Sequence, residues 1–213
     1  MADAPEHPIF AWFYDRMLDS VEKGGLAEMR GGLLSDATGR ILELGAGTGH
    51  NLAHYPDSVT TLVLTEPDPY MAARLRERLR RDGHPARAEA VVDEVSAEEL
   101  PYEDGSFDTV VSTLVLCTVP DPRRTLAEVR RVLAPGGSLI FIEHVRGDGG
   151  VRAWVQDRLE RPWGFVAGGC HPNRPTGEML ADAGLRVERL DRGKLPKAGP
   201  LIKPMVKGVA TRP

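Results

Sequence analysis

The sequence is poor in the residues that mark disulfide frameworks, zinc sites and nucleic-acid binding. It contains only two cysteines among 213 residues, Cys117 and Cys170, and they form no Cys-x-x-Cys pair. Neither a disulfide framework nor a metal site is therefore indicated, and a reducing cytoplasm is the simplest compartment. The 27 Lys and Arg residues are outnumbered by 31 Asp and Glu residues, so no basic field is available to attract nucleic acid. We do not expect nucleic acid as a partner.

Long apolar runs are missing as well. The N-terminal stretch MADAPEHPIFAWFYDRML has no basic segment ahead of its apolar residues, which Asp15 and Arg16 interrupt. We therefore expect neither a signal peptide nor a membrane span, and no later stretch is long and apolar enough to cross a bilayer. With 41% hydrophobic and 27% charged residues, the composition is typical of one globular domain, placed over residues 1–213.

Short apolar runs alternate with helical patterns along most of the chain. Apolar residues repeat every three or four positions around 71–79 and 126–133, as in helices. Because right-handed crossovers return each strand parallel to the one before, the alternation predicts a Rossmann-like, doubly wound α/β sheet, whose ligands bind beyond the carboxyl ends of the strands. The runs interpreted as buried strands are 40–44, 60–65, 90–95, 107–116 and 137–143.

The two ends of the chain depart from this alternation. Helical spacing between residues 9 and 21 predicts an amphipathic helix, and we interpret 1–30 as a helical cap on a cofactor-binding core at 36–145. The remainder, 146–213, is expected to form the substrate side. Its predicted elements are a helix over 151–164 stopped by Pro162, a loop over 165–176, a short helix ending at Gly184, and strands at 185–192 and 205–212.

The linker between the last two predicted strands is too short for a crossover helix. We therefore expect them to form an antiparallel pair at one edge of the sheet. The complete prediction is a seven-stranded sheet that is mostly parallel and has an antiparallel last strand.

The turn ELGAGTGHN follows the first apolar run and holds three glycines, Gly45, Gly47 and Gly49. A dinucleotide fingerprint would need a further glycine at His50, which disfavours a dehydrogenase, and a phosphate loop would need Gly-Lys-Ser/Thr there. What remains is a ligand that needs close backbone approach without a pyrophosphate. A nucleoside carrying an amino acid, such as S-adenosylmethionine, fits that description.

The second predicted strand ends at Glu66, in the segment TEPDP. This acid follows the glycines by about twenty residues, a spacing at which a carboxylate accepts hydrogen bonds from both hydroxyls of a ribose. The alternative, a solvated acid in a proline-rich turn, is disfavoured by that spacing.

Four segments, in order, resemble the motifs of class I S-adenosylmethionine-dependent methyltransferases: ILELGAGTG, LTEPDP, SAEELPYEDGSFDTVVST and EVRRVLAPGGSLIFIEHV. The resemblance implies S-adenosylmethionine as cofactor and S-adenosylhomocysteine as product. It also implies that the turn holds the amino-acid part, the acid binds ribose, the segment after the third strand covers adenine, and residues past the fourth strand lie along the sulfonium. The cofactor-binding residues so implied are Tyr14, Gly45, Ala46, Gly47, Gly49, Glu66, Pro67, Ser96, Ala97, Glu98, Thr113 and Leu114.

One position departs from the motifs, because Ser96 stands where the family often has an Asp that bonds the adenine amino group. A hydroxyl accepts such a bond less strongly than a carboxylate.

The tail carries a second resemblance. TLVLCTVPDP, FIEHV, RPWGFVAGGCHPNRPT and IKPMVKGVATR resemble the animal microsomal methyltransferases that methylate small alkyl thiols, whose N-terminal hydrophobic anchor is not apparent here. Their loop motif of Gly-Cys-Asn, then Arg and Ser/Thr, corresponds to Gly169, Cys170, His171, Arg174 and Thr176, with His171 in place of Asn. This resemblance implies a small thiol as methyl acceptor.

Methyl transfer from a sulfonium requires alignment, a dry pocket, and a base only where the acceptor is protonated. The candidate catalytic residues are His144, which follows the fifth predicted strand, with His171 and Arg174 in the tail loop, and each favours a thiolate. His144 is as readily interpreted as a residue that bonds a neighbouring loop, and Cys117 and Cys170 as packing residues. O- or N-methylation of a small metabolite, and cofactor binding without turnover, stay open alternatives, as does the oligomeric state.

Overall fold

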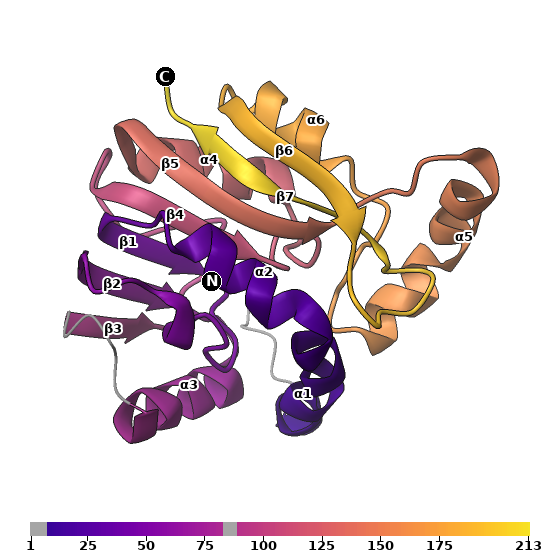
Figure 1. The fold of residues 1–213 in the computed structure, drawn as a ribbon, viewed down its shortest axis with the longest axis horizontal. Coiled ribbons are helices and arrows are strands. Elements are labelled where there is room, and N and C mark those ends of the chain that lie inside the picture. The colour runs from indigo at the N-terminus through magenta and orange to yellow at the C-terminus, as the bar shows by residue number, and fades with distance from the viewer. Residues whose placement is uncertain (1–7, 83–88) are drawn as a thin grey trace.

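The apolar runs form one seven-stranded sheet in a computed structural model that describes residues 8–82 and 89–213 (Figure 1). The strand order is β3-β2-β1-β4-β5-β7-β6, and the first five strands pair in parallel. Only β7 runs the other way, antiparallel to β5 and to β6. The predicted fold class is confirmed. The strands are β1 (Gly39–Leu44), β2 (Val59–Thr65), β3 (Glu89–Asp93), β4 (Phe107–Thr113), β5 (Leu133–His144), β6 (Arg186–Lys194) and β7 (Pro204–Thr211).

The centre of the sheet determines where a ligand can bind. Leu42 on β1 lies opposite Val63 on β2 and Val110 on β4, so β1 has later strands on both sides. The chain therefore leaves β1 and β4 in opposite directions, and the connections beyond their carboxyl ends diverge. The glycine turn follows β1 at this point.

The central strands β1, β2, β4 and β5 are largely buried on both faces, whereas the edge strand β6 is mostly exposed. Neighbouring residues point to opposite sides, so Val110 and Leu139 join one hydrophobic cluster, whereas Val111 and Ile140 join another. Figure 1 shows α2 in front of the sheet and α4 and α6 behind it. The helices are α1 (Pro8–Val21), a π-helix η1 (Glu22–Leu26), α2 (Ala27–Leu34), a 3₁₀ turn η2 (Leu52–His54), α3 (Pro69–Asp82), α4 (Pro122–Val132), α5 (Gly150–Val166) and α6 (Thr176–Asp182).

The helices predicted from spacing are present, and α1 begins within one residue of the predicted start. No helix in the described part of the chain has both the length and the apolar character needed to cross a bilayer. The division into cap, core and substrate side stays a prediction.

The predicted helix end at Pro162 is wrong, because α5 continues to Val166. Proline lacks the N–H that would bond the carbonyl four residues earlier, at Arg158. Both residues are exposed, so water can hydrate that carbonyl and the helix continues.

Four strand boundaries differ from the prediction by two residues or more, among them the end of β6 at Lys194 rather than 192. The third strand ends at Asp93 rather than 95, and the fifth begins at Leu133, which lies opposite Phe107 of β4 before the Ala-Pro-Gly-Gly segment interrupts the register and pairing resumes at Ser138. The fourth strand ends at Thr113 rather than 116, because Leu114 has φ +63° and turns the chain out of the sheet.

One buried amide fastens α5 to the rest of the substrate side. Gln156 is fully buried, and its Oε1 accepts the N–H of Gly147 at 2.8 Å. Its Nε2 donates to the carbonyls of Val145, Pro172 and Leu201 at 3.2, 2.8 and 2.9 Å. Three separate segments therefore meet at one side chain of α5.

Gln156→Ala should lower the free energy of unfolding by at least about 2 kcal/mol, because it leaves several buried backbone groups unsatisfied at about 1–3 kcal/mol each. Urea unfolding of the variant and the parent protein measures the difference. Arg158→Ala, at an exposed site on the same helix, is the matched control and should change stability little. Equal destabilisation by the two substitutions would contradict the anchoring role.

Candidate active site

The glycine turn and the acid after β2 lie in direct contact. The N–H of Gly47 donates to Glu66 Oε2 at 2.8 Å, and the N–H of Asp68 donates to Glu66 Oε1 at 3.0 Å. Glu66 is only 7% exposed, and burial raises its pKa to about 7 although both N–H groups act in the opposite direction. A carboxylate offers about four lone-pair positions, and two are used here. The remaining two suit a pair of hydroxyls, so this acid fits the ribose of the expected cofactor.

A tyrosine of α1 lies directly over the backbone of the turn. Gly47 has φ +58°, and a Cβ on it would lie 3.6 Å from Cε1 of Tyr14. Tyr14 therefore covers the turn, and burial raises the pKa of its hydroxyl to about 12. A ligand that contacts the backbone of Gly47 also meets this neutral phenol on α1.

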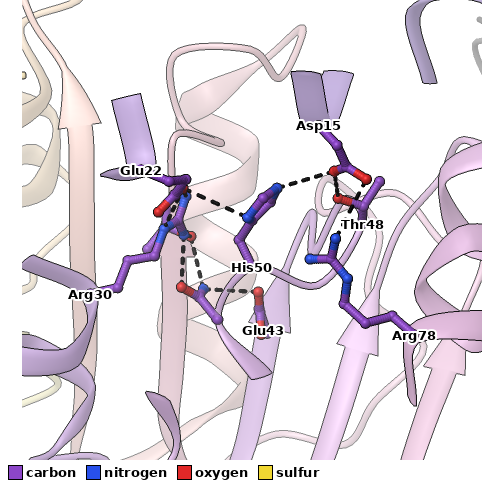
Figure 2. Close-up of polar contacts among 9 residues, drawn as sticks. Asp15, Glu22, Arg30, Glu43, Thr48, His50 and Arg78 are labelled. Carbon is purple, nitrogen blue, oxygen red and sulfur yellow. Dashed lines mark hydrogen bonds and ion pairs between the residues drawn. The ribbon is translucent and has the colours of Figure 1, made fainter. Parts of the chain in front are cut away.

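A single carboxylate holds α1 over the turn (Figure 2). Asp15 accepts a short hydrogen bond from the hydroxyl of Thr48, lies 3.1 Å from Nε2 of His50, and pairs with Arg74 and Arg78 of α3 at 2.7 and 3.4 Å. Burial opposes its ionisation, but the bonds from Thr48 and Arg74 outweigh burial and lower its pKa. Asp15 thus joins α1, the glycine turn and α3.

Sequence reasoning missed a buried arginine on α2. Arg30 is 3% exposed and donates from Nε to Glu22 Oε1 at 3.1 Å, with its Nη2 3.0 Å from the same oxygen. Its Nη1 donates to Asn51 Oδ1 at 2.7 Å and to the Thr113 hydroxyl at 2.9 Å. Thr113, predicted to line the sulfonium, therefore has its oxygen engaged by this cation. No periodic pattern around Arg30 pointed to it.

A second missed residue is Glu43, the acid inside the strand sequence RILEL. Its Oε1 accepts from Asn51 Nδ2 at 2.9 Å and its Oε2 from the Tyr55 hydroxyl at 2.7 Å. Burial raises the pKa of Glu43 to about 7 despite these donors. An acid among buried strand residues was the available signal, since it must have partners to be tolerated there. Asn51 is bonded to both residues and so joins Glu43 to Arg30. Figure 2 draws these contacts.

The segment after β3 lies beside Glu66, because the N–H of Glu66 donates to the carbonyl of Asp93 at 3.0 Å. Ser96 accepts the N–H of Glu98 at 3.2 Å, and Ala97 is buried. Glu98 accepts a short bond from the N–H of Asp121, the residue that caps α4. The predicted adenine segment is therefore fastened at both ends. Among the other predicted residues, Ala46 is buried and bonded to the carbonyl of Thr65, and Pro67 directly follows Glu66.

The connection after β4 is organised by the buried carboxylate of Glu143. Its Oε1 accepts from the Ser112 hydroxyl at 2.7 Å and from the N–H groups of Val115 and Leu116 at 3.1 and 3.0 Å. Its Oε2 accepts the N–H of Cys117 at 3.2 Å. Burial raises the pKa of Glu143, and these donors act against it. The connection is thereby held as a tight loop.

This loop touches the glycine turn and the tail. A Cβ on Gly45 would lie 3.0 Å from Val115, so the turn packs directly on it. On the tail side, Arg174 donates a short bond to the carbonyl of Leu116, and the N–H of His171 donates to the carbonyl of Cys117 at 2.7 Å.

All three predicted catalytic residues therefore lie around this loop. His171 Nδ1 is 2.8 Å from Glu160 Oε1 on α5, which orients its ring. His144 Nδ1 lies 3.6 Å from the sulfur of Cys117 and 3.5 Å from that of Cys170. The two cysteines, distant in sequence and without metal-site spacing, are thus close in space.

Glu66→Gln tests the burial of this acid. The pKa of Glu66 is about 7 in the folded protein against an ordinary 4.5, so between these values the folded state holds a proton that the unfolded chain has released. The contribution of Glu66 to the free energy of unfolding is therefore present at low pH and lost as pH rises through this window. The Gln variant has no such titrating group. The difference in the free energy of unfolding, variant minus parent protein, should therefore become more positive by roughly 2–3 kcal/mol between about pH 5 and about pH 8.

Urea unfolding of the cofactor-free proteins at both pH values measures this. The amide also mismatches one backbone N–H, but that cost does not vary with pH and cancels in the comparison. Glu77→Gln, at an exposed site on α3, is the control. Parallel pH curves for the Glu66 variant and the parent protein would contradict the prediction.

Comparisons with known proteins agree with this geometry. Residues 42–141 match the family model described as a methyltransferase domain. Human thiol S-methyltransferase TMT1B is 33% identical over 201 residues, covering 93% of this chain and 81% of that protein. A phosphatidylethanolamine N-methyltransferase of Cereibacter sphaeroides is 35% identical over 149 residues, a match that covers 70% of this chain and 71% of that protein.

Solved structures support the fold. The crystal structure of a putative methyltransferase from Bacillus halodurans superposes with a TM-score of 0.71 at 14% identity, covering 88% of this chain and 98% of that one. The sheet order, the contact between Gly47 and Glu66, the family match and the two relatives lead to one assignment: the chain belongs to the class I S-adenosylmethionine-dependent methyltransferases.

Proposed function

We propose that this methyltransferase transfers a methyl group to the sulfur of a small thiol. The observation that carries the proposal is the extent of the match to the human thiol S-methyltransferase. The family model ends at residue 141, within the part expected to bind the cofactor. The match to the human protein leaves only 7% of this chain outside, so it includes most of 146–213, the part expected to face the acceptor.

Bound S-adenosylmethionine supplies a methyl group on a positively charged sulfur, ready for in-line attack. The chain's own residues bind and orient this donor. The backbone of Gly47 allows close approach, Glu66 accepts the ribose hydroxyls, and Tyr14 covers the turn and excludes water. Gly45, Gly49, Leu114 and the segment from Ser96 to Glu98 complete the proposed cofactor site.

On the acceptor side, His171 is the best-placed base. The Glu160 carboxylate holds its Nδ1, which leaves Nε2 to accept the proton of a thiol. Arg174 adds a positive charge next to the same loop and favours the thiolate. An ordinary thiol is already a few per cent ionised near neutral pH, so modest help is sufficient. His144 lies deeper, against the two cysteines.

N-methylation is the second candidate function, favoured by the match to the phosphatidylethanolamine N-methyltransferase. That match covers less of this chain than the thiol enzyme's does. O-methylation of a metabolite, cofactor binding without turnover, and the cytoplasmic location stay predictions.

The deciding experiment is transfer of labelled methyl from S-adenosylmethionine to a panel of thiols, amines and phenols at pH values from about 6 to 9, which span the thiol ionisation range. Thiol products whose rate of formation follows the thiolate fraction are the expected result. Products from amines or phenols alone would move the assignment to N- or O-methylation. Cofactor binding with no product from any acceptor would indicate a protein without turnover.

Glu66→Ala should weaken S-adenosylmethionine binding by about 1.5 to 3 kcal/mol, the range for hydrogen bonds to a charged group. Isothermal titration with S-adenosylhomocysteine measures the affinity, and circular dichroism checks the fold. Glu77→Ala should bind as the parent protein does. Unchanged affinity in the Glu66 variant would remove this acid from the site.

His171→Ala should slow methylation of an alkyl thiol by roughly 10²-fold if His171 takes the thiol proton. An aromatic thiol that is already ionised at the assay pH needs no base, so its rate should change little. Glu160→Gln should give a weaker form of the same pattern, and His54→Gln, at a histidine on η2, should not. Equal losses with both thiols, or loss of cofactor affinity, would show that His171 does not act as the base.

A further inference from the structure

Three side chains that can bind a metal ion converge beside the proposed acceptor site. Cys117 comes from the loop after β4, His144 from the end of β5 and Cys170 from the loop after α5. Their ligand atoms all lie within 4.8 Å of one another, all three residues are buried, and neither cysteine is in a disulfide.

The spacing of these atoms suits a tetrahedral ion. Zinc binds Cys sulfur at about 2.3 Å and His nitrogen at about 2.0–2.1 Å, which places nitrogen and sulfur about 3.5–3.6 Å apart at a tetrahedral angle. The observed distances from His144 Nδ1 to the two sulfurs are 3.6 and 3.5 Å. Both nitrogen–sulfur distances therefore match a tetrahedral ion, and the two sulfurs lie within 4.8 Å of each other.

Nδ1 of His144 is the shared neighbour of both thiols, and Cys117 Sγ also lies 3.6 Å from Thr118 Oγ1. Nδ1 of a neutral imidazole has one lone pair, yet two thiols lie within reach of it. One S–H can donate to that lone pair, and the other thiol then has no equivalent acceptor on the ring. A cation bound to two thiolates and Nδ1 uses all three ligand atoms together, whereas the buried Nε2 of His144 has no hydrogen-bond partner in the described part of the chain.

The backbone already holds the ligands in place. The N–H of Cys117 is bonded to Glu143 and its carbonyl to the N–H of His171. The N–H of Cys170 donates to the carbonyl of Ala167 at 3.2 Å. A site with fixed ligands loses little conformational freedom when it binds an ion.

We infer that Cys117, His144 and Cys170 form a zinc-binding site. Binding one Zn²⁺ forms two sulfur–zinc bonds and one nitrogen–zinc bond and releases the two thiol protons to solvent, so the loaded cluster is neutral. The described part of the chain supplies three ligands, which leaves the fourth position for water or an exogenous ligand. Cys170 and His144 are each 7% exposed, and the ion enters from their side. This site does not depend on the identity of the methyl acceptor.

The test uses the full chain, reduced with a phosphine and freed of metal by a chelator. Titration with Zn²⁺ in competition with a chromogenic chelator should give one ion per chain with roughly submicromolar or tighter affinity. A weakly buffered titration should show release of two protons. Co²⁺ should give the visible bands of a tetrahedral site and a thiolate-to-metal charge-transfer band.

Variants and alkylation separate this site from adventitious binding. Cys170→Ser and His144→Gln should each weaken Zn²⁺ binding by at least about 100-fold, since each removes one of three ligands, whereas His54→Gln should not. Cys170 lies at the edge of the cluster, so its variant is expected to fold, which circular dichroism verifies. Bound Zn²⁺ should also protect both cysteines of the parent protein from alkylation.

Binding that survives in Cys170→Ser, alkylation at the same rate with and without Zn²⁺, or a Cys117–Cys170 disulfide that forms equally well in its presence would each overturn the inference.

Discussion

The buried carboxylate of Glu143 is the constraint on which both sides of the active site depend. It takes four hydrogen bonds, one from the Ser112 hydroxyl on β4 and three from consecutive backbone N–H groups of the loop after β4. Burying a charge without partners costs several kcal/mol, so the acid needs the N–H groups of the loop. The loop conformation in turn depends on this carboxylate as the acceptor for its N–H groups. The loop then presents Val115 to the glycine turn, and its carbonyls to the tail. A substitution at Glu143 should therefore disturb both the glycine turn and the tail loop that carries His171 and Arg174.

The cofactor side is built on the same physical basis. Glu43, Glu66, Asp15 and Arg30 are charged or titratable groups held in a largely buried network, where the pKa values of the first two are raised to about 7. Such networks contribute little net stability, because desolvation offsets much of the attraction. Their effect is positional: they fix α1, the glycine turn and the ends of β1, β2 and β4 relative to one another. This is the preorganisation that an in-line methyl transfer needs.

Local sequence patterns were enough for the sheet and for one pair of contacts. Short continuous apolar runs predicted the strands, because a buried parallel strand must be apolar on both faces. The spacing of Gly47 and Glu66 placed these two residues at neighbouring strand ends. The cluster of Cys117, His144 and Cys170 was not predictable, because its members lie on three segments whose approach is set by the crossovers and by Gln156. Arg30 was missed for the same reason, since its three partners, Glu22, Asn51 and Thr113, come from three other segments. Pro162 misled because an exposed carbonyl can be hydrated, which sequence does not reveal.

The donor and the acceptor are expected to contact different parts of the chain, and this explains why the acceptor is harder to assign than the donor. The matched methyltransferase region ends at residue 141, and the groups proposed to hold the donor lie within it or on α1. Relatives named for a thiol and for a lipid amine both match this chain, so a shared donor site is compatible with different acceptors. What differs between acceptors is the need for a base and the shape of the pocket. The residues proposed for these roles are His171, oriented by Glu160, and Arg174, bonded to the loop that Glu143 holds. On this proposal, acceptor choice depends on a few side chains of the tail, which are bonded to the loop that the Glu143 carboxylate holds.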